Sequence, residues 1–244
     1  MSCKVMGIVN VTPDSFSDGG QFFRPEEAIR RAKNLVAEGA DIIDLGGEST
    51  RPGATPVGWK EEWSRIEPAL NDLMSSVSRL KSFQISVDTY HPETAERAIA
   101  AGADVINCVY AEPIPEMVKL LNANDVELVL PVSALNLIPD PRSLIPRLYL
   151  DPMIGFGTTR EEDVELLRSI PELAKRGRVL VGASRKRIVK KLVGEKSAVG
   201  KNVGGNVAIA VWAAMNGASV VRVHDVKETV QALRVIDALG EGER

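Results

Sequence analysis

The amino-acid sequence predicts an α/β protein of the (β/α)8 TIM-barrel class, a closed sheet of parallel strands surrounded by helices. Short apolar runs alternate along the chain with longer stretches of helical periodicity, as in repeated βα units. Eight such runs can be counted, the number that closes a parallel barrel. Residues 38–41, 101–104 and 216–219 share one pattern, in which a glycine follows a helical stretch and precedes an apolar run. Glycine is favoured just past a helix end because it adopts the left-handed conformation without a Cβ clash.

The predicted strands are short, and the first is rich in β-branched residues, as expected for a buried parallel strand. Pro13, Asp14, Gly19 and Gly20 prevent the first strand from continuing, so Asn10 lies close to its end. The eight runs comprise residues 5–11, 42–45, 85–87, 105–106, 128–132, 148–150, 179–181 and 220–223.

Helices are predicted between most of these strands, at residues 25–38, 59–81, 92–101, 114–121, 160–175, 202–216 and 227–239. One connection differs. Residues 133–147 contain Pro139, Pro141 and Pro146, and proline in a helix interior removes a hydrogen bond and clashes with the preceding turn. We therefore expect an abbreviated connection between the fifth and sixth strands instead of a full crossover helix.

The composition favours one soluble globular unit. A length of 244 residues and a hydrophobic content of 44% suit a single domain over residues 1–244. A formal net charge of -3 argues against nucleic acid or an anionic membrane as a partner. The sequence lacks a long apolar run and a signal-peptide pattern, so a cytoplasmic location is predicted. Cys3 and Cys108 are too few for a disulfide scaffold and are predicted to be free thiols.

Polar residues end almost every predicted strand. The carboxyl ends of the strands in a parallel barrel meet on one face, so these side chains would converge on one cavity. Loops are generally polar, so chance can account for one or two polar residues at strand ends. It accounts less easily for three carboxylates together with two cations. We therefore predict a binding site on this face, built from Asn10, Asp44, Glu48, Asp88, Asn107, Ser133, Asp151, Ser184, Lys186, Arg222 and His224.

These side chains suit a flat heterocycle with hydrogen-bonding edges. An ionised Asp151 can accept two parallel N–H bonds from an amino-amide edge. The planar guanidinium of Arg222 can stack on a ring face and still bind phosphate. Lys186 offers a compact cation for a carbonyl or ring nitrogen.

The neighbouring loops suit an anionic group such as a pyrophosphate. Residues 12–20 and 46–53 are rich in glycine and hydroxyl side chains, and Arg51 adds positive charge. Such an anion usually binds with Mg²⁺, which takes few protein oxygens and keeps several waters. The side-chain oxygen of Asn10 is the candidate metal ligand, with Asp18 nearby in the loop.

Two segments resemble the signature segments of the dihydropteroate synthase family. They read MGIVNVTPDSFSDGG at residues 6–20 and GADIIDLGGESTRPG at residues 39–53. Five shorter motifs follow in the order found in that family: SVDT at 86–89, IN at 106–107, DPMIGFG at 151–157, SRK at 184–186 and RVHD at 222–225. The resemblance therefore spans most of the chain, from Val5 to about Leu239.

The resemblance implies a (β/α)8 barrel that condenses 6-hydroxymethyl-7,8-dihydropterin pyrophosphate with p-aminobenzoate, or a related arylamine. The products would be 7,8-dihydropteroate and pyrophosphate, in folate biosynthesis, with Mg²⁺ as cofactor. It also implies a homodimer formed through the late helices. A pterin-dependent methyltransferase and a non-catalytic pterin-binding protein remain the alternatives.

The resemblance also implies roles by position. The pterin would be held by Asp88, Asn107, Asp151 and Lys186, and the pyrophosphate with its Mg²⁺ by Asn10, Thr50, Arg51, Arg222 and His224. The aromatic ring of the amine would lie among Phe16, Pro52 and Phe156. Catalysis would depend on Asp88, Lys186, Arg222 and His224, because the negative charge of Asp88 would stabilise a cationic pterin methylene while the others act on the pterin and the leaving group.

Three positions depart from the family pattern. Cys108 follows Asn107 where the family usually has an aspartate, and the sequence LPVS at 130–133 replaces a Met-His pair and a long loop. Arg187 follows Lys186 where the family often has a serine that helps to hold the p-aminobenzoate carboxylate. Arg187 is thus expected either to bind that carboxylate through its charge or to indicate a larger acidic arylamine.

Overall fold

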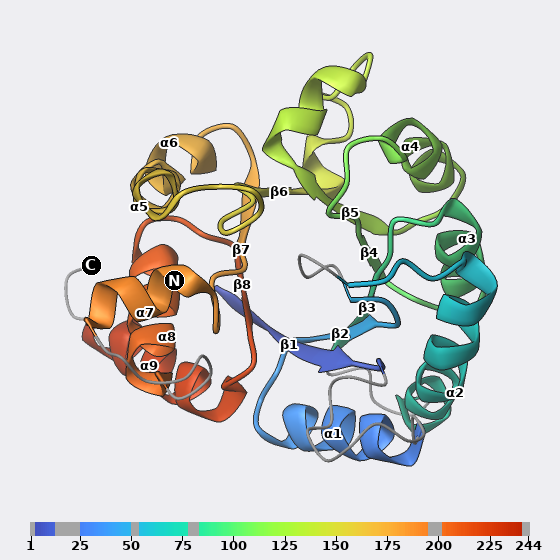
Figure 1. Ribbon diagram of the computed structural model, residues 1–244, viewed down its shortest axis with the longest axis horizontal. Helices are drawn as coiled ribbons and strands as arrows, with labels where there is room; N and C mark the ends of the chain where they lie inside the picture. Colours follow the sequence, from blue (N-terminus) through green and yellow to red (C-terminus); the bar gives the residue numbers. More distant parts are fainter. Residues whose placement is uncertain (1–2, 13–24, 50–53, 78–82, 195–201, 241–244) are drawn as a thin grey trace.

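A computed structural model describes residues 3–12, 25–49, 54–77, 83–194 and 202–240, and it shows a closed parallel barrel (Figure 1). The strands follow one another around the barrel in chain order, and β1 pairs with both β2 and β8. The predicted (β/α)8 class is therefore confirmed. The strands are β1 Lys4–Asn10, β2 Ile42–Gly46, β3 Gln84–Asp88, β4 Val105–Asn107, β5 Glu127–Pro131, β6 Leu148–Asp151, β7 Arg178–Val181 and β8 Val220–Val223.

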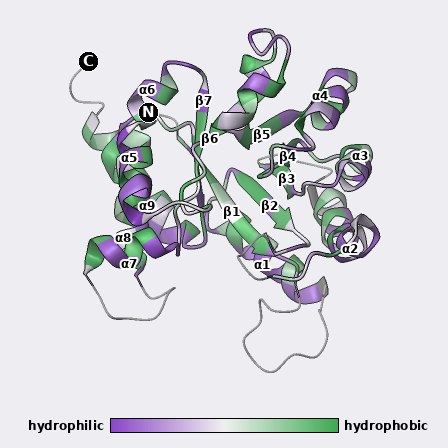
Figure 2. Ribbon diagram, turned by 45° about the horizontal axis from the view of Figure 1, so that its top comes forward, coloured by the Kyte–Doolittle hydropathy of each residue, from purple (hydrophilic) through white to green (hydrophobic). Residues whose placement is uncertain are grey.

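The helices form a ring outside the sheet (Figure 1). Most turn an apolar side toward the strands and a polar side outward (Figure 2), whereas α8 also exposes the apolar residues Trp212 and Met215. The helices are α1 Pro25–Ala37, α2 Trp59–Val77, α3 Pro92–Ala100, α4 Ile114–Ala123, α5 Arg160–Arg168, α6 Ile170–Ala174, α7 Arg187–Val193, α8 Val203–Met215 and α9 Val226–Gly240.

Two helical predictions need correction. The single helix expected at residues 160–175 is divided at Ser169 into α5 and α6. Pro171 occupies the first turn of α6, where its missing N–H group is tolerated, but it would interrupt the interior of one long helix. Helix α7 was not predicted, because it is short and buries only Ile188 and Val189 among basic residues, too few for a periodic pattern.

The abbreviated connection between β5 and β6 is confirmed. Two short 3₁₀ helices, Val132–Leu137 and Ile145–Arg147, take the place of a crossover helix. Arg147 closes this part of the wall, because its guanidinium donates to the backbone carbonyls of Leu121, Asn124 and Val126 at the end of α4 and before β5. The chain thus covers this side of the barrel without a full-length helix.

The barrel interior is filled by side chains in layers, each contributed by alternate strands. Strand alternation and register give two largely apolar layers, Ile42, Val105, Tyr149 and Val220, then Met6, Ser86, Val129 and Leu180. At the carboxyl ends of the strands, the next layer is entirely polar and consists of Asp44, Asn107, Asp151 and Arg222. The site predicted from the strand ends therefore rests on a packed hydrophobic plug.

A second polar layer closes the amino-terminal end of the barrel. Lys4 donates to Gln84 at 2.7 Å, and Gln84 donates to Glu127 at 3.1 Å. Glu127 also forms an ion pair with Arg178 at 2.5 Å and accepts from Tyr149 at 3.3 Å. We expect this layer to stabilise the barrel and not to bind a ligand, because the functional sites of this fold lie at the opposite face.

We expect Glu127→Ala to lower the free energy of unfolding by about 1–2 kcal/mol, because Arg178 and Gln84 lose their shared acceptor in a partly buried layer. Urea unfolding followed by circular dichroism measures this effect. Glu127→Gln is the matched control, since it retains an acceptor, and it should lose less. A large change in turnover by folded Glu127→Ala would contradict the purely structural role.

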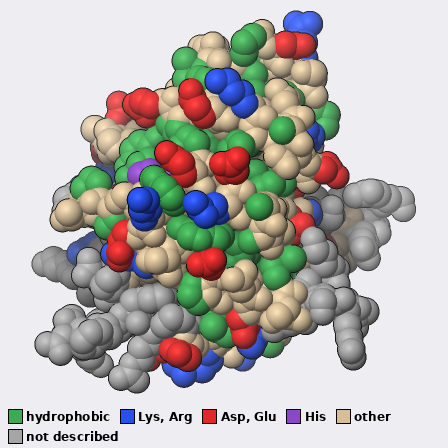
Figure 3. Space-filling view, turned by 90° about the vertical axis from the view of Figure 1, so that its right-hand side faces the viewer, with side chains coloured by type: hydrophobic (Ala, Val, Ile, Leu, Met, Phe, Trp, Pro, Cys, Tyr) green, Lys and Arg blue, Asp and Glu red, His purple; other side chains and the backbone are tan. Residues whose placement is uncertain are grey.

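The outer surface carries charges of both signs. Over the face formed by α2, α3 and α4, acidic and basic side chains are interspersed with small apolar areas (Figure 3). Such mixing is typical of a solvated surface. Within the described residues, no helix combines the length and apolar character needed to cross a membrane.

Candidate active site

Arg222 organises the centre of the polar layer at the carboxyl ends of the strands. Its Nε donates to Asp44 Oδ2 at 2.6 Å, and its Nη2 donates to Asp88 Oδ2 at 2.6 Å. Asn107 Nδ2 donates to the same Asp44 oxygen at 3.3 Å. One guanidinium from β8 thus joins β2 and β3 across the mouth of the barrel, and three of its five N–H groups are not used in these two bonds.

Acceptor atoms remain open beside this ion pair. Among the described residues, Asp44 Oδ1, Asn107 Oδ1 and Ser86 Oγ are buried without a hydrogen-bond partner. An unpaired buried polar atom is unfavourable by about 1–3 kcal/mol, so such atoms are rare and usually face a polar ligand or water. The floor of the site is therefore suited to a ligand with N–H donors.

Lys186 and the loop after β6 form one side of the site. Lys186 Nζ donates to the Ile154 carbonyl at 2.5 Å and lies 4.3 Å from the centre of the Phe156 ring. Asp151 Oδ1 accepts from the Met153 N–H group at 2.7 Å. Met153 has a left-handed backbone, with φ of 62°, which is unusual for a residue with a side chain. The loop therefore folds back so that Asp151 and Lys186 share one wall.

His224 lies on the other side, where the loops after β7 and β8 are joined. Its Nδ1 is 3.1 Å from Ser184 Oγ, and its carbonyl accepts from Arg31 at 2.7 Å. The next residue, Asp225, accepts from Arg185 at 2.7 Å and from Asn206 at 2.8 Å. These contacts fix the position of the loop that carries Lys186.

The charges in the site are closely balanced. Burial raises the pKa of Asp88 to about 7, although Arg222 opposes this shift. Burial also raises the pKa of Asp151, with Lys186 as the main opposing charge. For Lys186 itself, burial outweighs the opposing charge of Asp151, and the net pKa is lowered to about 8. Burial likewise acts against the charge of Arg222, but Asp44 and Asp88 outweigh it and raise the pKa. At each of these four groups, burial and a neighbouring charge of opposite sign thus act against each other.

Comparison with known proteins agrees with this geometry. A family model described as pterin binding enzyme matches residues 6–136 and 144–224. A dihydropteroate synthase from Staphylococcus haemolyticus is 37% identical over 261 residues, which cover 98% of this chain and 96% of that protein. The chain belongs to the dihydropteroate synthase family. A second member, from Neisseria meningitidis serogroup C, is 38% identical over 278 residues and is covered to 93%.

Solved structures of the dihydropteroate synthase family share the fold over nearly the whole chain. The Xanthomonas albilineans enzyme with 4-aminobenzoic acid has a TM-score of 0.85 and 39% identity, covering 98% of this chain and 93% of that one. The Anaplasma phagocytophilum enzyme with bound 6-hydroxymethylpterin-monophosphate has a TM-score of 0.83 and 30% identity, covering 98% and 100%. The family predicted from the motifs is therefore confirmed.

The structure brings together most of the residues expected from the family motifs. Asn10 ends β1 on its inward-facing register, next to β2, and Phe156 lies against Lys186. Arg187 is the exposed first residue of α7, directly after Lys186. Phe16, Thr50, Arg51 and Pro52 lie outside the described residues. The residues that line or border the polar layer are Asp88, Asn107, Asp151, Lys186, Arg222 and His224.

The sequence pattern alone did not reveal the importance of two buried carboxylates. Asp44 was noted only as a polar strand end, yet it is fully buried and forms an ion pair with Arg222 as short as that of Asp88. Its position two residues after Ile42, on the inner face of the same strand, was the available signal. Asp163, which holds the loop after β6, was hidden among the exposed acidic residues at the start of α5.

Cys108, which directly follows β4, is a buried neutral thiol. It is 1% exposed, and burial raises its pKa to about 12. Its Sγ donates to the Tyr110 carbonyl at 3.4 Å. Both Cys3 and Cys108 are free, as predicted. The negative charge of this site therefore comes from Asp44, Asp88 and Asp151.

A separate group of ionisable residues lies where β2 and β3 end and α2 packs against them. Oxygen and nitrogen atoms of Glu48, Glu62 and His91 lie within 4.8 Å of one another. His91 Nε2 is 3.2 Å from Glu48 and 3.0 Å from the Val57 carbonyl, while Glu62 accepts from Thr89 at 2.6 Å. These hydrogen bonds join the ends of β2 and β3 to α2.

Proposed function

We propose that this chain is a dihydropteroate synthase that condenses 6-hydroxymethyl-7,8-dihydropterin pyrophosphate with p-aminobenzoate or a related arylamine. The products are 7,8-dihydropteroate and pyrophosphate. The observation that carries the proposal is Arg222, held between Asp44 and Asp88 beside open acceptors at the floor of a barrel of this family. The proposal includes a role in folate biosynthesis, one catalytic domain and a cytoplasmic location.

The pterin is recognised along its hydrogen-bonding edges. Its amino-amide edge has N–H donors, which fit Asp151 and the open oxygen of Asn107. Lys186 uses one of its three donors on the Ile154 carbonyl, so two remain for acceptors on the ring. Relatives solved with a pterin or with 7,8-dihydropteroate support this ligand class.

In the reaction, the bond between the pterin methylene carbon and the diphosphate oxygen breaks. The arylamine nitrogen forms a bond to that carbon and releases one proton to solvent. The carboxylate of Asp88 stabilises the positive charge that develops on the methylene. Arg222 and His224 stabilise the negative charge of the departing diphosphate, with Ser184 fixing the imidazole ring.

The residues fit Mg²⁺ bound together with the diphosphate. Asn10 offers an amide oxygen at the mouth of the barrel, and Mg²⁺ prefers such hard oxygen ligands and retains several waters. Thr50 and Arg51 are further candidates for the diphosphate end. When bound, Mg²⁺ would neutralise charge on the leaving group.

We expect Asn10→Ala to raise the Mg²⁺ concentration needed for half-maximal turnover by about tenfold, because one protein ligand is lost. A titration of activity against Mg²⁺ measures this shift. Asn10→Asp is the control, since it retains an oxygen donor and should respond at lower Mg²⁺. If Asn10→Ala and the parent chain need the same Mg²⁺ concentration, Asn10 is not a ligand of the metal.

The overall proposal is tested by incubating the purified chain with the pterin pyrophosphate, Mg²⁺ and a panel of arylamines. Formation of the dihydropteroate product supports it, and the panel identifies the amine that Arg187 and Phe156 accept. Pterin binding without product from any amine or metal would instead favour a non-catalytic binding protein. Methyl transfer to a corrinoid protein would favour the methyltransferase alternative.

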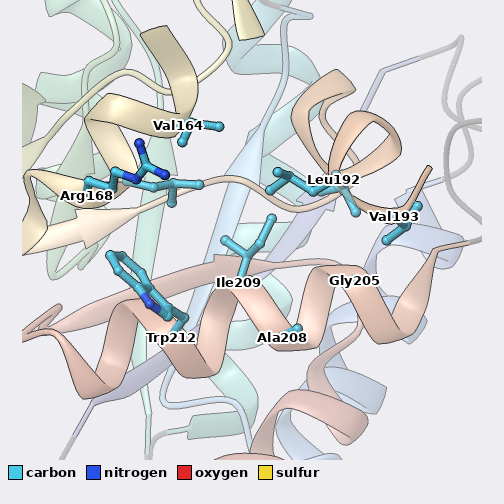
Figure 4. Close-up of a pocket in the computed structure, with 10 residues that line it drawn as sticks. Val164, Arg168, Leu192, Val193, Gly205, Ala208, Ile209 and Trp212 are labelled. Carbon is cyan, nitrogen blue, oxygen red and sulfur yellow. The ribbon is translucent and has the colours of Figure 1, made fainter. Parts of the chain in front are cut away.

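We also propose a homodimer formed through the late helices. An apolar cavity of about 410 Å³ lies between α5, α7 and α8 (Figure 4), lined by Leu192, Ile209, Trp212 and their neighbours. Trp212 and Leu192 are 39% and 52% exposed, and Met215 on the same helix as Trp212 is 52% exposed. Because this surface combines a groove with projecting apolar side chains, a second copy can pack against it by two-fold symmetry.

We expect the parent chain to elute as a dimer and Trp212→Glu to elute as a folded monomer, because the charge would be buried in the interface. Size-exclusion chromatography with light scattering gives the mass. Leu239→Glu is the control, since Leu239 is exposed at the end of α9, outside the lining of this cavity. A monomeric parent chain at all concentrations would overturn the proposal.

A further inference from the structure

The loop between β6 and α5 is held by one buried carboxylate. Asp163 lies in the first turn of α5 and is only 3% exposed. Its Oδ1 accepts from the Gly155 N–H group at 2.7 Å and from Thr158 Oγ1 at 2.5 Å. Asp163 thus joins α5 to two residues of the loop.

This loop has little regular structure of its own. Met153, Gly155 and Gly157 all have positive φ angles, of 62°, 78° and 71°. A left-handed backbone is unfavourable for Met153, so the conformation depends on contacts that hold it. The hydrogen bonds to Asp151 at Met153 and to Asp163 at Gly155 are such contacts.

The part of the loop that Asp163 holds also positions Lys186. Ile154, the neighbour of Gly155, accepts from Lys186 Nζ at 2.5 Å. Gly155 packs so closely on the Lys186 stem that a Cβ at this position would lie 3.0 Å from Lys186 Cδ. A shift of Gly155 would therefore move the ammonium group.

The charge of Asp163 also acts on Lys186. The ionisable groups that act on Lys186 are Asp151 from β6, Arg222 from β8, Asp163 from α5 and Asp88 from β3. Burial, followed by Arg222, lowers the pKa of Lys186, the three carboxylates raise it, and the net pKa is about 8. Loss of one carboxylate should therefore favour the neutral amine at mildly alkaline pH.

We propose that Asp163 is a positioning residue that holds the β6–α5 loop against Lys186, so that the ammonium group of Lys186 faces the pterin. The inference rests on the proposed function, since it assigns Lys186 to pterin recognition. Asp163 acts through the loop and through its charge, and the two effects can be separated by different substitutions.

Two variants of Asp163 and one control test this proposal. Asp163→Asn retains an acceptor oxygen for Gly155 and Thr158 but removes the charge. Asp163→Ala removes both. Glu165→Gln on the same helix removes a charge from an exposed pair with Arg168, without contact to the loop. For each protein, calorimetric pterin affinity, KM for the pterin pyrophosphate, kcat and the pH profile of kcat/KM are measured, with circular dichroism as the folding check.

We expect Asp163→Asn to keep pterin affinity near that of the parent chain at pH 7 and to move the alkaline limb of its pH profile down by about half a pH unit. Asp163→Ala should weaken pterin binding by about tenfold or more and raise the KM for the pterin pyrophosphate. The control Glu165→Gln should change neither quantity.

Unchanged pterin affinity in folded Asp163→Ala, or an alkaline limb in Asp163→Asn that coincides with the parent, would overturn the proposal. A lower melting temperature alone, with unchanged affinity and pH profile, would show a merely structural role and also overturn it. If the parent chain binds pterin but yields no product, the proposed function fails, while the affinity measurements still decide the role of Asp163.

Discussion

Asp151→Ala is expected to weaken pterin binding about a thousandfold while the barrel remains folded. Asp151 closes the polar layer from β6, and its carboxylate is the acceptor proposed for two N–H groups of the pterin. Two charge-assisted hydrogen bonds contribute about 1.5–3 kcal/mol each, which gives an effect of this size. Isothermal titration calorimetry with 6-hydroxymethylpterin measures the loss.

The fold should tolerate the change, because the partners of Asp151 belong mainly to the ligand. Burial raises the pKa of Asp151, so its ionisation opposes folding as the pH rises above the value of about 3.9 in an unfolded chain. Asp151→Asn, which keeps an acceptor for the Met153 N–H group, should therefore melt at or above the parent temperature at pH 8. Unchanged pterin affinity in Asp151→Ala would show that the ligand binds elsewhere.

Arg222→Met is expected to abolish turnover and to destabilise the fold by about 3–5 kcal/mol. The substitution leaves Asp44, which is fully buried, and Asp88 without their shared guanidinium. An uncompensated buried carboxylate is far less favourable than a buried pair. Urea unfolding at pH 7 measures the destabilisation, and the synthase assay measures the activity.

The destabilisation should depend on pH with a definite sign. Burial already raises the pKa of Asp88 to about 7, and Arg222 is the main group that opposes this shift. Without Arg222 the pKa of Asp88 rises further, so the folded state retains its proton more strongly than the unfolded chain. Stability is then lost as the pH rises. We expect the difference between Arg222→Met and the parent to be larger at pH 8 than at pH 5.

A double variant provides the control. Arg222→Met combined with Asp44→Asn removes one buried negative charge together with the cation, so it should recover part of the stability but none of the activity. If the double variant is no more stable than Arg222→Met, Arg222 stabilises the barrel mainly through packing of its stem. Full activity in either variant would show that Arg222 is not required for the reaction.

Local sequence patterns were sufficient for most of the architecture. Apolar runs and post-helical glycines are local signals, so they placed the strands and the crossover helices and indicated the missing helix before Leu148. They failed where the pattern was weak or interrupted. Pro171 divides α5 from α6, and α7 is too short and too basic to show a periodicity.

For the site, the sequence by itself determined which residues end the strands, and thus that Asp88, Asn107, Asp151 and Arg222 lie on one face. Only the tertiary structure decided how they pair. Arg222 is 178 residues from Asp44 and 134 from Asp88, and closure of the barrel brings the three together. The role of Asp163 could not be predicted from the sequence either, because it depends on the conformation of a loop that contains residues with positive φ angles. Strand ends are fixed by local periodicity, whereas partners, burial and charge balance depend on contacts between residues distant in the chain.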